Sequence, residues 1–426
     1  MFGENLRVIK IRKRTAPQWM ILGFFLMPFM LAFLTEFIGL PGFVRYVMDA
    51  LVVCLVALLF FRKQVIIPQK LKPMFWLVAI FFAYVLISYL FNYQSIFYFI
   101  WGTRNTFRFY FAFLIFVSYV TQEDAEKWLK FLDILFWINL AVSIYQFFVL
   151  QAHQDLLGGI FGVNASANGY MLVFFVAVIG RALISAFNGD ESYFYCTLKC
   201  AASLFVAAIA EMKFYYFAFV IMLIVATVIT PRSRSKVVFL IVAFISVFAA
   251  AALLVAFYSE FADFFSLKKL WELATKENYS TSNDINRLSA ISTLLKNNII
   301  GGANSVFGMG LGNCDTSNIS IFNSTFYQNF SFLHYQWFTF VMIFMETGFL
   351  GLGLFWAFFV LCIVHSLKYL NNGTGNKMFC QLGVLMGVLC LAISLYNASL
   401  RIEAGYMAYF VLALPFMVSE ETLNIS

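Results

Sequence analysis

A histidine and an arginine stand out among the residues that could do chemistry. His334 opens the apolar run HYQWFTFVMIFMETGFLGLGLFW, and it follows about 75 residues, 258–333, that contain Arg287 and most of the loop polarity of the chain. An imidazole accepts a proton near neutral pH, and a guanidinium forms two parallel hydrogen bonds with a phosphate. We therefore predict that His334 and Arg287 are catalytic residues acting on a substrate presented at a membrane surface.

Further basic residues stand near the expected ends of apolar segments. Arg104 and Arg108 are four residues apart, so they project from one face of a helix, and Lys213 and Arg401 occupy short turns. Charges at a membrane boundary are costly unless they are paired or bind an anion. Each can be explained singly as a snorkelling or salt-bridged residue. Together with His334, these four cations predict a binding site for a phosphate-rich substrate.

The segment GGIFGVNASANGYM adds two polar side chains, because Asn164 and Asn168 lie four residues apart in it. One interpretation is that these amides bind a sugar or a phosphate of the substrate. The alternative is that Asn168 caps the helix that follows and that both side chains only pack. The sequence leaves both interpretations open.

The composition places these residues in a membrane protein. The chain has 426 residues, of which 62% are hydrophobic and 12% are charged, whereas a soluble globular protein has about twice that charged fraction. The net charge of +7 arises mainly in short loops beside apolar segments, where basic residues fix orientation and meet anionic lipid. We therefore predict contact with membrane lipid and no nucleic-acid partner.

Apolar runs of about 16 to 22 residues recur along nearly the whole chain, and each is long enough to cross roughly 30 Å of hydrocarbon as a helix. Only helices and closed barrels satisfy the backbone inside a bilayer. We therefore predict an all-α polytopic membrane protein with about twelve transmembrane helices. The runs lie near residues 18–35, 43–61, 74–91, 106–120, 129–150, 169–187, 195–210, 214–230, 237–257, 348–366, 378–396 and 404–419.

The charge of the short loops predicts how these helices are oriented. Residues 1–17 and 62–73 are rich in lysine and arginine, which is typical of segments on the cytoplasmic side. Both termini are then cytoplasmic. Residues 1–257 would contain nine of the helices, 258–333 a long outer loop, and 334–426 the histidine segment with three more helices.

Within the outer loop we predict two helices. Residues 259–277 have apolar side chains at three- and four-residue spacing and mixed charges, which is typical of a helix lying at the membrane interface. Residues 283–298 predict a second helix that contains Arg287 and is N-capped by Asn283 or Asp284.

No cofactor site is predicted. Gly308, Gly310 and Gly312 alternate as in a nucleotide-binding loop, but no strand precedes them and no βαβ unit can form around them. We instead predict a compact turn in which backbone amides approach a ligand or another helix. The 7 cysteines and 3 histidines show no spacing typical of a metal site, so we predict no metal either.

The polar loop and the histidine segment together resemble a known family. The segment NRLSAISTLLKNNIIGGANSVFGMGLGN, followed by His334 and METGFLGLGLFW, is similar to the O-antigen ligase and Wzy-type polysaccharide polymerase superfamily. FGVNASANGYM is similar to the asparagine-containing turn of that superfamily. Two positions depart from its pattern. Tyr335 stands where members often have asparagine, and Glu211, Met212 and Lys213 stand where members often have Ser-Arg.

The resemblance implies a glycosyltransferase that uses an undecaprenyl-diphosphate-linked oligosaccharide on the outer, periplasmic face of a bacterial inner membrane. Ligases of this superfamily move a finished glycan to a lipid A core or to a protein, whereas polymerases join repeat units. We predict a polymerase of O-antigen or capsule, because the fit to the ligase pattern is loose. A polymerase would add a chain-length regulator protein to the expected partners.

The same chemistry predicts a mechanism that needs no metal. Arg287 with Arg104 or Arg108 would stabilise the departing diphosphate, and His334 would accept the proton of the attacking sugar hydroxyl. A lipid-linked oligosaccharide flippase is the alternative from another class of protein. Transporters usually show internal repeats and midplane charges, whereas this chain places most charges at the ends of apolar segments.

Overall fold

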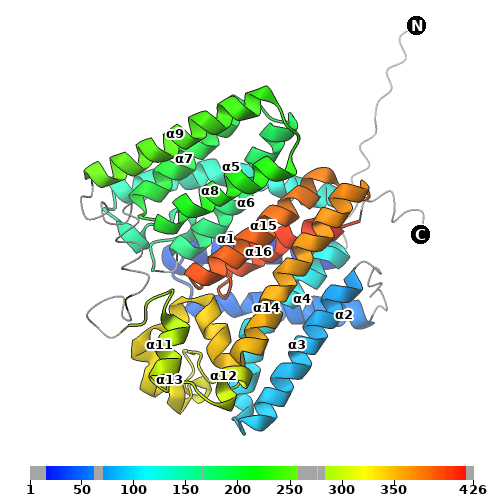
Figure 1. Ribbon diagram of the computed structural model, residues 1–426, viewed down its shortest axis with the longest axis vertical. Coiled ribbons are helices and arrows are strands. Elements are labelled where there is room, and N and C mark those ends of the chain that lie inside the picture. The colour runs from blue at the N-terminus through cyan, green and yellow to red at the C-terminus, as the bar shows by residue number, and fades with distance from the viewer. Residues whose placement is uncertain (1–15, 62–70, 166, 258–275, 277–283, 419–426) are drawn as a thin grey trace.

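The regular structure of the protein is helical. A computed structural model describes most of the chain, and its described residues form helices and no β-strand (Figure 1). The predicted all-α class is therefore confirmed for this part of the chain. The described residues are 16–61, 71–165, 167–257, 276 and 284–418. The interfacial helix predicted over 259–277 lies outside them, apart from residue 276.

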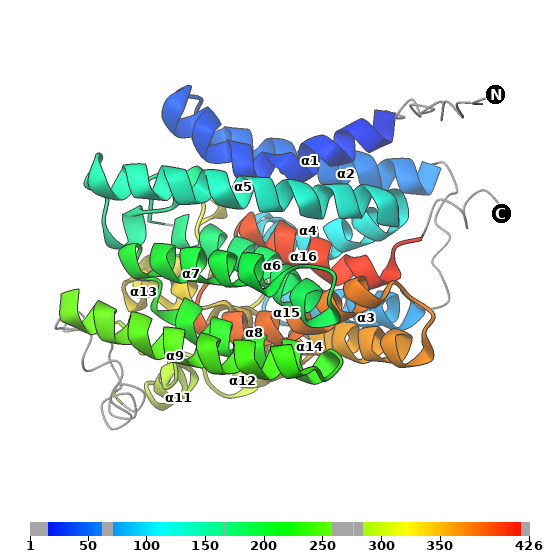
Figure 2. The ribbon, with the colours of Figure 1, turned by 90° about the horizontal axis from the view of Figure 1, so that it is seen from above.

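The longer helices lie side by side in one bundle, and Figure 2 shows α1 and α2 on one side of it and α9 on the opposite side. The helices of the bundle are α1 (Ala16–Ala32), α2 (Tyr46–Phe61), α3 (Lys72–Phe91), α4 (Ile96–Tyr119), α5 (Gln122–Phe148), α6 (Ala167–Asn188), α7 (Tyr193–Ile209), α8 (Lys213–Ile229), α9 (Arg234–Phe257), α14 (Thr339–Asn372), α15 (Lys377–Tyr396) and α16 (Ala404–Ala413). Between α9 and α14, the described residues include the short α-helices α11 (Ala290–Lys296), α12 (Ala303–Phe307) and α13 (Thr325–Phe330).

The protein is a multi-pass membrane protein, but the predicted count of about twelve spans is not met. Seven helices of the described chain are long and apolar enough to cross a membrane. The runs predicted in α7, α8 and α16 give apolar helices of only 10–17 residues, which fall short of roughly 30 Å at 1.5 Å per residue. The run in α4 is long enough, but Arg104, Asn105 and Arg108 make it more polar.

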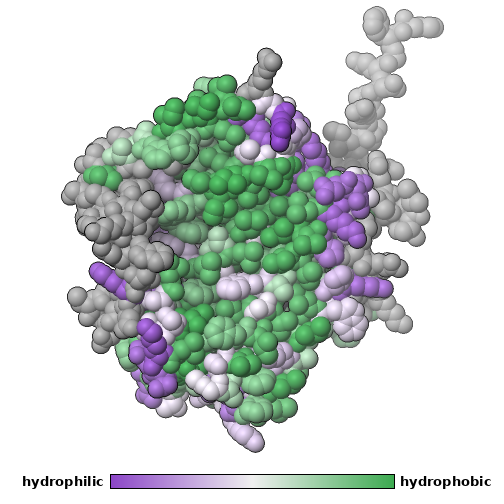
Figure 3. All heavy atoms as spheres, in the orientation of Figure 1, coloured by the Kyte–Doolittle hydropathy of each residue, from purple (hydrophilic) through white to green (hydrophobic). Residues whose placement is uncertain are grey.

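Apolar side chains cover much of the outside of the bundle, as lipid contact requires. Val238, Ile241 and Phe244 of α9 are each more than half exposed, and Figure 3 shows a broad hydrophobic surface on this face with hydrophilic residues toward its margins. The centre of the bundle is different. In the apolar 18-residue stretch of α6, 89% of the residues are buried, whereas 22% are buried in the corresponding stretch of α3.

Helix α14 is broken at Gly348, which has φ +66° and ψ −171°. The break leaves carbonyl oxygens of the preceding turn without helical partners. Backbone N–H groups of the predicted glycine turn, residues 308–312, donate hydrogen bonds to these carbonyls. The backbone N–H of Met309 donates to the carbonyl of Met345 at 2.8 Å, and that of Gly310 donates to the carbonyl of Glu346 at 3.1 Å. The prediction that backbone amides of this turn approach another helix is therefore confirmed.

The helix predicted over 283–298 is shorter than expected. It begins at Ala290 as α11, so Asp284 does not cap it and Arg287 lies in the turn before it. Asn283 lies outside the described residues. The reason is a tertiary contact, because the backbone N–H of Ile285 donates at 3.1 Å to a carbonyl of the segment that precedes α14. That bond holds the chain extended where the sequence alone favours a helix.

Candidate functional site

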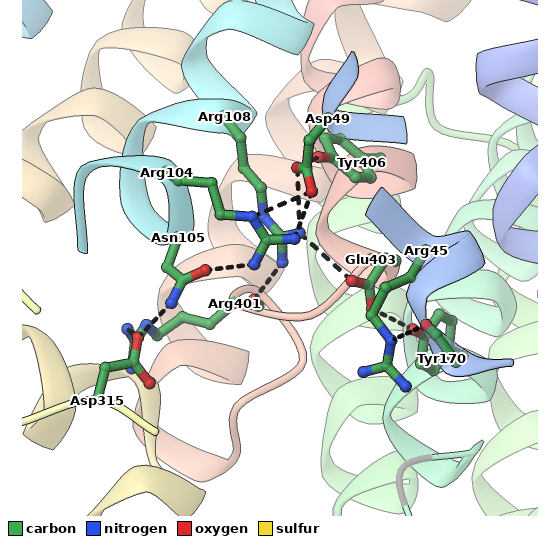
Figure 4. A network of polar contacts seen from close by, with 11 residues as sticks. Arg45, Asp49, Arg104, Asn105, Arg108, Tyr170, Asp315, Arg401, Glu403 and Tyr406 are labelled. Carbon is green, nitrogen blue, oxygen red and sulfur yellow. Dashed lines mark hydrogen bonds and ion pairs between the residues drawn. The ribbon is translucent and has the colours of Figure 1, made fainter. Parts of the chain in front are cut away.

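Two arginines of α4 share one carboxylate of α2. Arg104 places Nε 3.0 Å and Nη2 2.5 Å from Oδ2 of Asp49, and Arg108 places Nη1 3.6 Å from Oδ1 of Asp49 (Figure 4). The rings of Tyr46 and Trp101 each lie 5.0 Å from the guanidinium carbon of Arg104, a distance at which an aromatic face attracts a cation. The predicted common face of the two arginines is confirmed, and it turns toward α2.

The other side of Arg108 faces the segment that precedes α16. Arg108 Nη1 lies 3.3 Å from Oε1 of Glu403, and Arg108 Nη2 donates to the carbonyl of Arg401 at 2.9 Å. The hydroxyl of Tyr170 donates to Oε2 of Glu403 at 2.5 Å. Burial raises the pKa of Glu403, but Arg108 and Tyr170 outweigh that effect and hold this pKa below its usual value.

Arg401 joins this group to the glycine turn and to α14. Its Nη2 lies 2.7 Å from Oδ2 of Asp315 and 3.7 Å from Oε2 of Glu346. Asn105 bridges two of the ion pairs, because it accepts from Arg104 at 2.5 Å and donates to Asp315 at 2.7 Å (Figure 4). Oε2 of Glu346 has no hydrogen-bond partner in the described chain, although its side chain is fully buried.

These residues form one connected set, which we call the arginine network. Sequence reasoning predicted three of its cations, but it assigned no part to the carboxylates that pair with them. Asp49 and Glu346 each interrupt an apolar run, and a carboxylate in such a run must be partnered. That signal was present in the sequence. The arginine network comprises Asp49, Arg104, Asn105, Arg108, Asp315, Glu346, Arg401 and Glu403.

A cavity of about 260 Å³ opens beside the arginine network, between α2 and α4. We call it the α2–α4 groove. Its walls are apolar and include Val53 and Phe111, which are 68% and 41% exposed, so the groove reaches the lipid-facing surface of the bundle. Asp49, Arg104 and Arg108 supply the charges that line it. The groove thus offers an apolar wall and two cations in one place.

His334 lies between two turns of 3₁₀ helix, and it has a left-handed backbone with φ +53°. This conformation is uncommon for a residue with a side chain. Two backbone hydrogen bonds hold this conformation. The backbone N–H of His334 donates to the carbonyl of Ser331, and the carbonyl of His334 accepts from the backbone N–H of Trp337, both at 3.0 Å. The half-buried imidazole stacks on the indole of Trp337, with ring centroids 4.1 Å apart and 6° between the planes.

Arg287 is positioned by aromatic rings. Its guanidinium carbon lies 4.3 Å from the ring centre of Tyr396 and 5.6 Å from that of Phe338. Phe214 stacks on the same Tyr396 ring at 4.3 Å and 18°. Two groups this close cannot share one face of a ring, so Tyr396 lies between Arg287 and Phe214. Lys213, the residue before Phe214, begins α8 and therefore lies near this stack.

Backbone contacts connect Arg287 to the histidine segment. Ile285, two residues before Arg287, donates to the carbonyl of Leu333, the residue before His334, at 3.1 Å. On its other side, the hydroxyl of Tyr335 donates to the carbonyl of Cys314 at 2.9 Å, one residue from the Asp315 that pairs with Arg401. The histidine segment and the arginine network are therefore neighbours, because Tyr335 contacts Cys314 and Arg401 pairs with Asp315, the next residue.

The two asparagines hold loops together. Asn164 donates to Oε1 of Glu36 at 2.8 Å, and Asn168 donates to Oδ1 of Asp155 at 3.0 Å and to the carbonyl of Ala210 at 3.2 Å. Asn168 lies inside α6, which begins one residue earlier, so the capping alternative is wrong. These bonds agree with the packing alternative and bring neither side chain into the arginine network.

A second set of charges, in which Lys199 is buried and its partners are partly exposed, joins α5, α6 and α7. We call it the lysine cluster. Nζ of Lys199 lies 3.1 Å from Oδ1 of Asp133 and 3.0 Å from Oε1 of Glu191. Arg181 pairs with the other oxygen of Asp133. None of these four residues lines the α2–α4 groove. The sequence analysis did not single them out.

The sequence matches no protein-family model and no curated protein.

Proposed function

We propose that this protein is a membrane glycosyltransferase that polymerises undecaprenyl-diphosphate-linked oligosaccharide repeat units into a surface polysaccharide. The observation that supports this most is the α2–α4 groove, in which Arg104 and Arg108 lie between apolar walls open to the lipid side. A polyprenyl diphosphate combines a long apolar chain with a polyanionic head. Its chain would enter sideways along the apolar wall, and its head would meet the two guanidinium groups.

The same arginines suit the chemical step. Cleavage of the bond between the sugar and the phosphate leaves negative charge on the diphosphate, and fixed cations lower the barrier by stabilising that charge as it develops. Arg104 and Arg108 already have partners that fix their orientation. In this proposal they replace a metal ion, and the reaction proceeds without one.

His334 is the proposed general base. Its imidazole is half-buried and stacks on Trp337, and the next residue, Tyr335, contacts Cys314 beside the arginine network. In this proposal the imidazole would accept the proton of the sugar hydroxyl that attacks the donor. Arg287 is held on Tyr396 next to this segment. Its charge would stabilise the diphosphate of the acceptor glycan or the departing diphosphate of the donor. Lys213 and Arg401 would add positive charge around the bound sugars and phosphates.

The proposal includes a cellular setting. The protein would lie in a bacterial inner membrane with His334 on the periplasmic side, and a chain-length regulator protein would be a partner. A ligase that transfers the glycan to a lipid A core or to a protein would use the same donor site, so the nature of the acceptor distinguishes ligase from polymerase.

A flippase for lipid-linked oligosaccharide is the second candidate, because α14 is broken at Gly348 and broken helices are typical of transporters. Chemistry separates the two functions. Purified protein in detergent should convert a lipid-diphosphate repeat unit into longer glycans. A flippase would leave the glycan length unchanged in detergent and would only change the side of the membrane that the substrate occupies in liposomes.

A further inference from the structure

The anion that sits on the groove arginines belongs to the protein itself. Asp49 lines the α2–α4 groove together with Arg104 and Arg108. One of its oxygens accepts two hydrogen bonds from Arg104, at 3.0 and 2.5 Å, and the other lies 3.6 Å from Arg108. A carboxylate and a phosphate oxygen bind guanidinium in the same way. Asp49 therefore occupies the position in which a phosphate of the groove ligand would bind.

Glu403 pairs with the same Arg108 but has a different place. It lies 3.3 Å from Arg108, closer than Asp49 does, yet it does not line the groove. Its second oxygen accepts from Tyr170, and its side chain is only 6% exposed. Glu403 thus orients Arg108 from behind, whereas Asp49 covers the side of the arginines that faces the groove.

We propose that Asp49 is a built-in competitor for the diphosphate site, and that a polyprenyl diphosphate must displace it from Arg104 and Arg108 in order to bind. This inference rests on the proposed function, because it concerns the same groove and the same class of ligand. The displaced carboxylate keeps one partner within reach, since the hydroxyl of Tyr406 lies 3.4 Å from its Oδ1.

Displacement has two consequences for the groove. Every anionic ligand loses the same part of its binding energy in moving Asp49, so the affinity of the site for phosphates is lower than its two arginines alone would give. A singly charged phospholipid head exchanges one anion for another, and the arginines therefore do not hold bulk lipid tightly. When the diphosphate product leaves, Asp49 returns to the arginines and competes with it for rebinding.

The test measures binding rather than activity. The purified full-length chain in detergent is titrated with inorganic pyrophosphate and, separately, with farnesyl diphosphate, which adds an apolar chain. Asp49→Asn should lower the Kd for both probes by roughly tenfold, because the ligand no longer has to break a charge-assisted hydrogen bond. Farnesyl diphosphate should bind more tightly than pyrophosphate in every variant that has an intact groove. Equal Kd values for the two probes would assign the site to free phosphates rather than to a lipid and would contradict the proposal.

Glu403→Gln is the matched control, because it removes one negative charge beside the same Arg108 without opening the groove. Its Kd for pyrophosphate should not fall. An equal gain in Glu403→Gln would mean that net charge alone acts, and an unchanged or higher Kd in Asp49→Asn would mean that Asp49 does not compete. Either result overturns the inference.

Two further comparisons keep the test decisive. Asp49→Ser also removes the charge and should show the same gain in affinity, so it replaces Asp49→Asn if the asparagine variant folds poorly. Asp49→Glu keeps the charge and should show no gain.

Polymerisation by the wild type is assayed separately. If the wild type extends glycans and the Asp49 variants gain no affinity, this inference fails while the proposed function stands. If no variant binds either probe and the wild type makes no product, both fail.

Discussion

The arginine network and the lysine cluster use the same chemistry in two settings. Both are sets of buried and partly buried ion pairs that connect several helices. They touch α6 at Tyr170 and at Arg181, about 16 Å apart along the helix axis at 1.5 Å per residue. Only the arginine network borders a groove. Lys199 lies between two carboxylates away from this groove, whereas Arg104 and Arg108 line it. We propose that a ligand reaches these two arginines by displacing Asp49.

The difference shows which buried charges suggest a function. An ion pair that lines no groove gives back little more than the free energy lost on removing its charges from water, so its main effect is to fix the relative positions of helices. A pair that lines an apolar groove can exchange its partner for a ligand. On this reasoning the lysine cluster positions α5, α6 and α7, and we propose that the arginine network and the histidine segment form the working site.

The largest effect on glycan assembly is expected at the histidine segment. His334→Ala should lower turnover by about 10² to 10⁴, the usual contribution of a general base, while the amount of folded protein and the affinity for pyrophosphate stay close to those of the wild type. The measurement is product formation per folded molecule, with folding checked by size exclusion. Poor expression with only a modest loss of turnover would instead make His334 a structural residue and remove it from the working site.

Loss of a groove arginine should have the next largest effect. Arg104→Gln removes a donor that we place at the developing diphosphate charge, and turnover should fall by about 10² to 10³. Arg104 is preferable to Arg108 for this experiment because its side chain is 21% exposed, against 6% for Arg108, so less buried charge is left unpaired. Normal polymerisation by folded Arg104→Gln would remove the functional distinction between the two sets of charges.

A smaller effect is expected for Arg287→Lys, which keeps the charge and loses the planar fork. The loss of one bidentate contact with phosphate corresponds to roughly 1.5 to 3 kcal/mol, or about tenfold or more in rate. The rate of glycan extension at saturating donor checks this value. Arg287 also stacks on Tyr396, so Tyr396→Leu serves as a control for loss of the stack alone. Full activity of Arg287→Lys would leave this arginine outside the site.

The smallest effect on the reaction is expected in the lysine cluster. Lys199→Met leaves Glu191 without its ion pair and should destabilise the protein by roughly 3 kcal/mol, visible as a lower melting temperature in detergent. The rate per folded molecule should stay within a few-fold of the wild type, and Lys199→Arg should recover stability. A hundredfold loss of rate in folded Lys199→Met would give the lysine cluster a role in function and break the contrast.

Much of the fold followed from the sequence, because apolar periodicity is local information. Each predicted run overlaps a helix, but not every helix has the length to cross a membrane, since the ends depend on tertiary contacts. Arg287 shows this limit. Its segment reads as helix, yet the contact of Ile285 with Leu333 holds it in a turn. The glycine turn was predictable because only glycine fits such close backbone approach.

Of the arginine network, only the positively charged residues were predictable from the sequence. Arg104 and Arg108 are four residues apart, so their shared face was visible in the sequence. Their pairing with Asp49 and Glu403 was not, because these carboxylates come from segments far away in the chain. Pairing of Arg401 with Asp315 joins residues 86 apart, and no local pattern specifies such a contact. The left-handed backbone of His334 also depends on the turns that flank it.

The most direct test of the proposed diphosphate chemistry is a polymerisation assay on the purified wild-type chain. The protein is incubated in detergent with a lipid-diphosphate repeat unit and excess EDTA, and product length is read on a gel beside Arg104→Gln and Lys199→Met. We predict a ladder of longer glycans from the wild type and from folded Lys199→Met, and none from Arg104→Gln. A wild-type reaction abolished by EDTA, or an Arg104→Gln ladder as long as that of the wild type, would contradict a metal-free site built on the groove arginines.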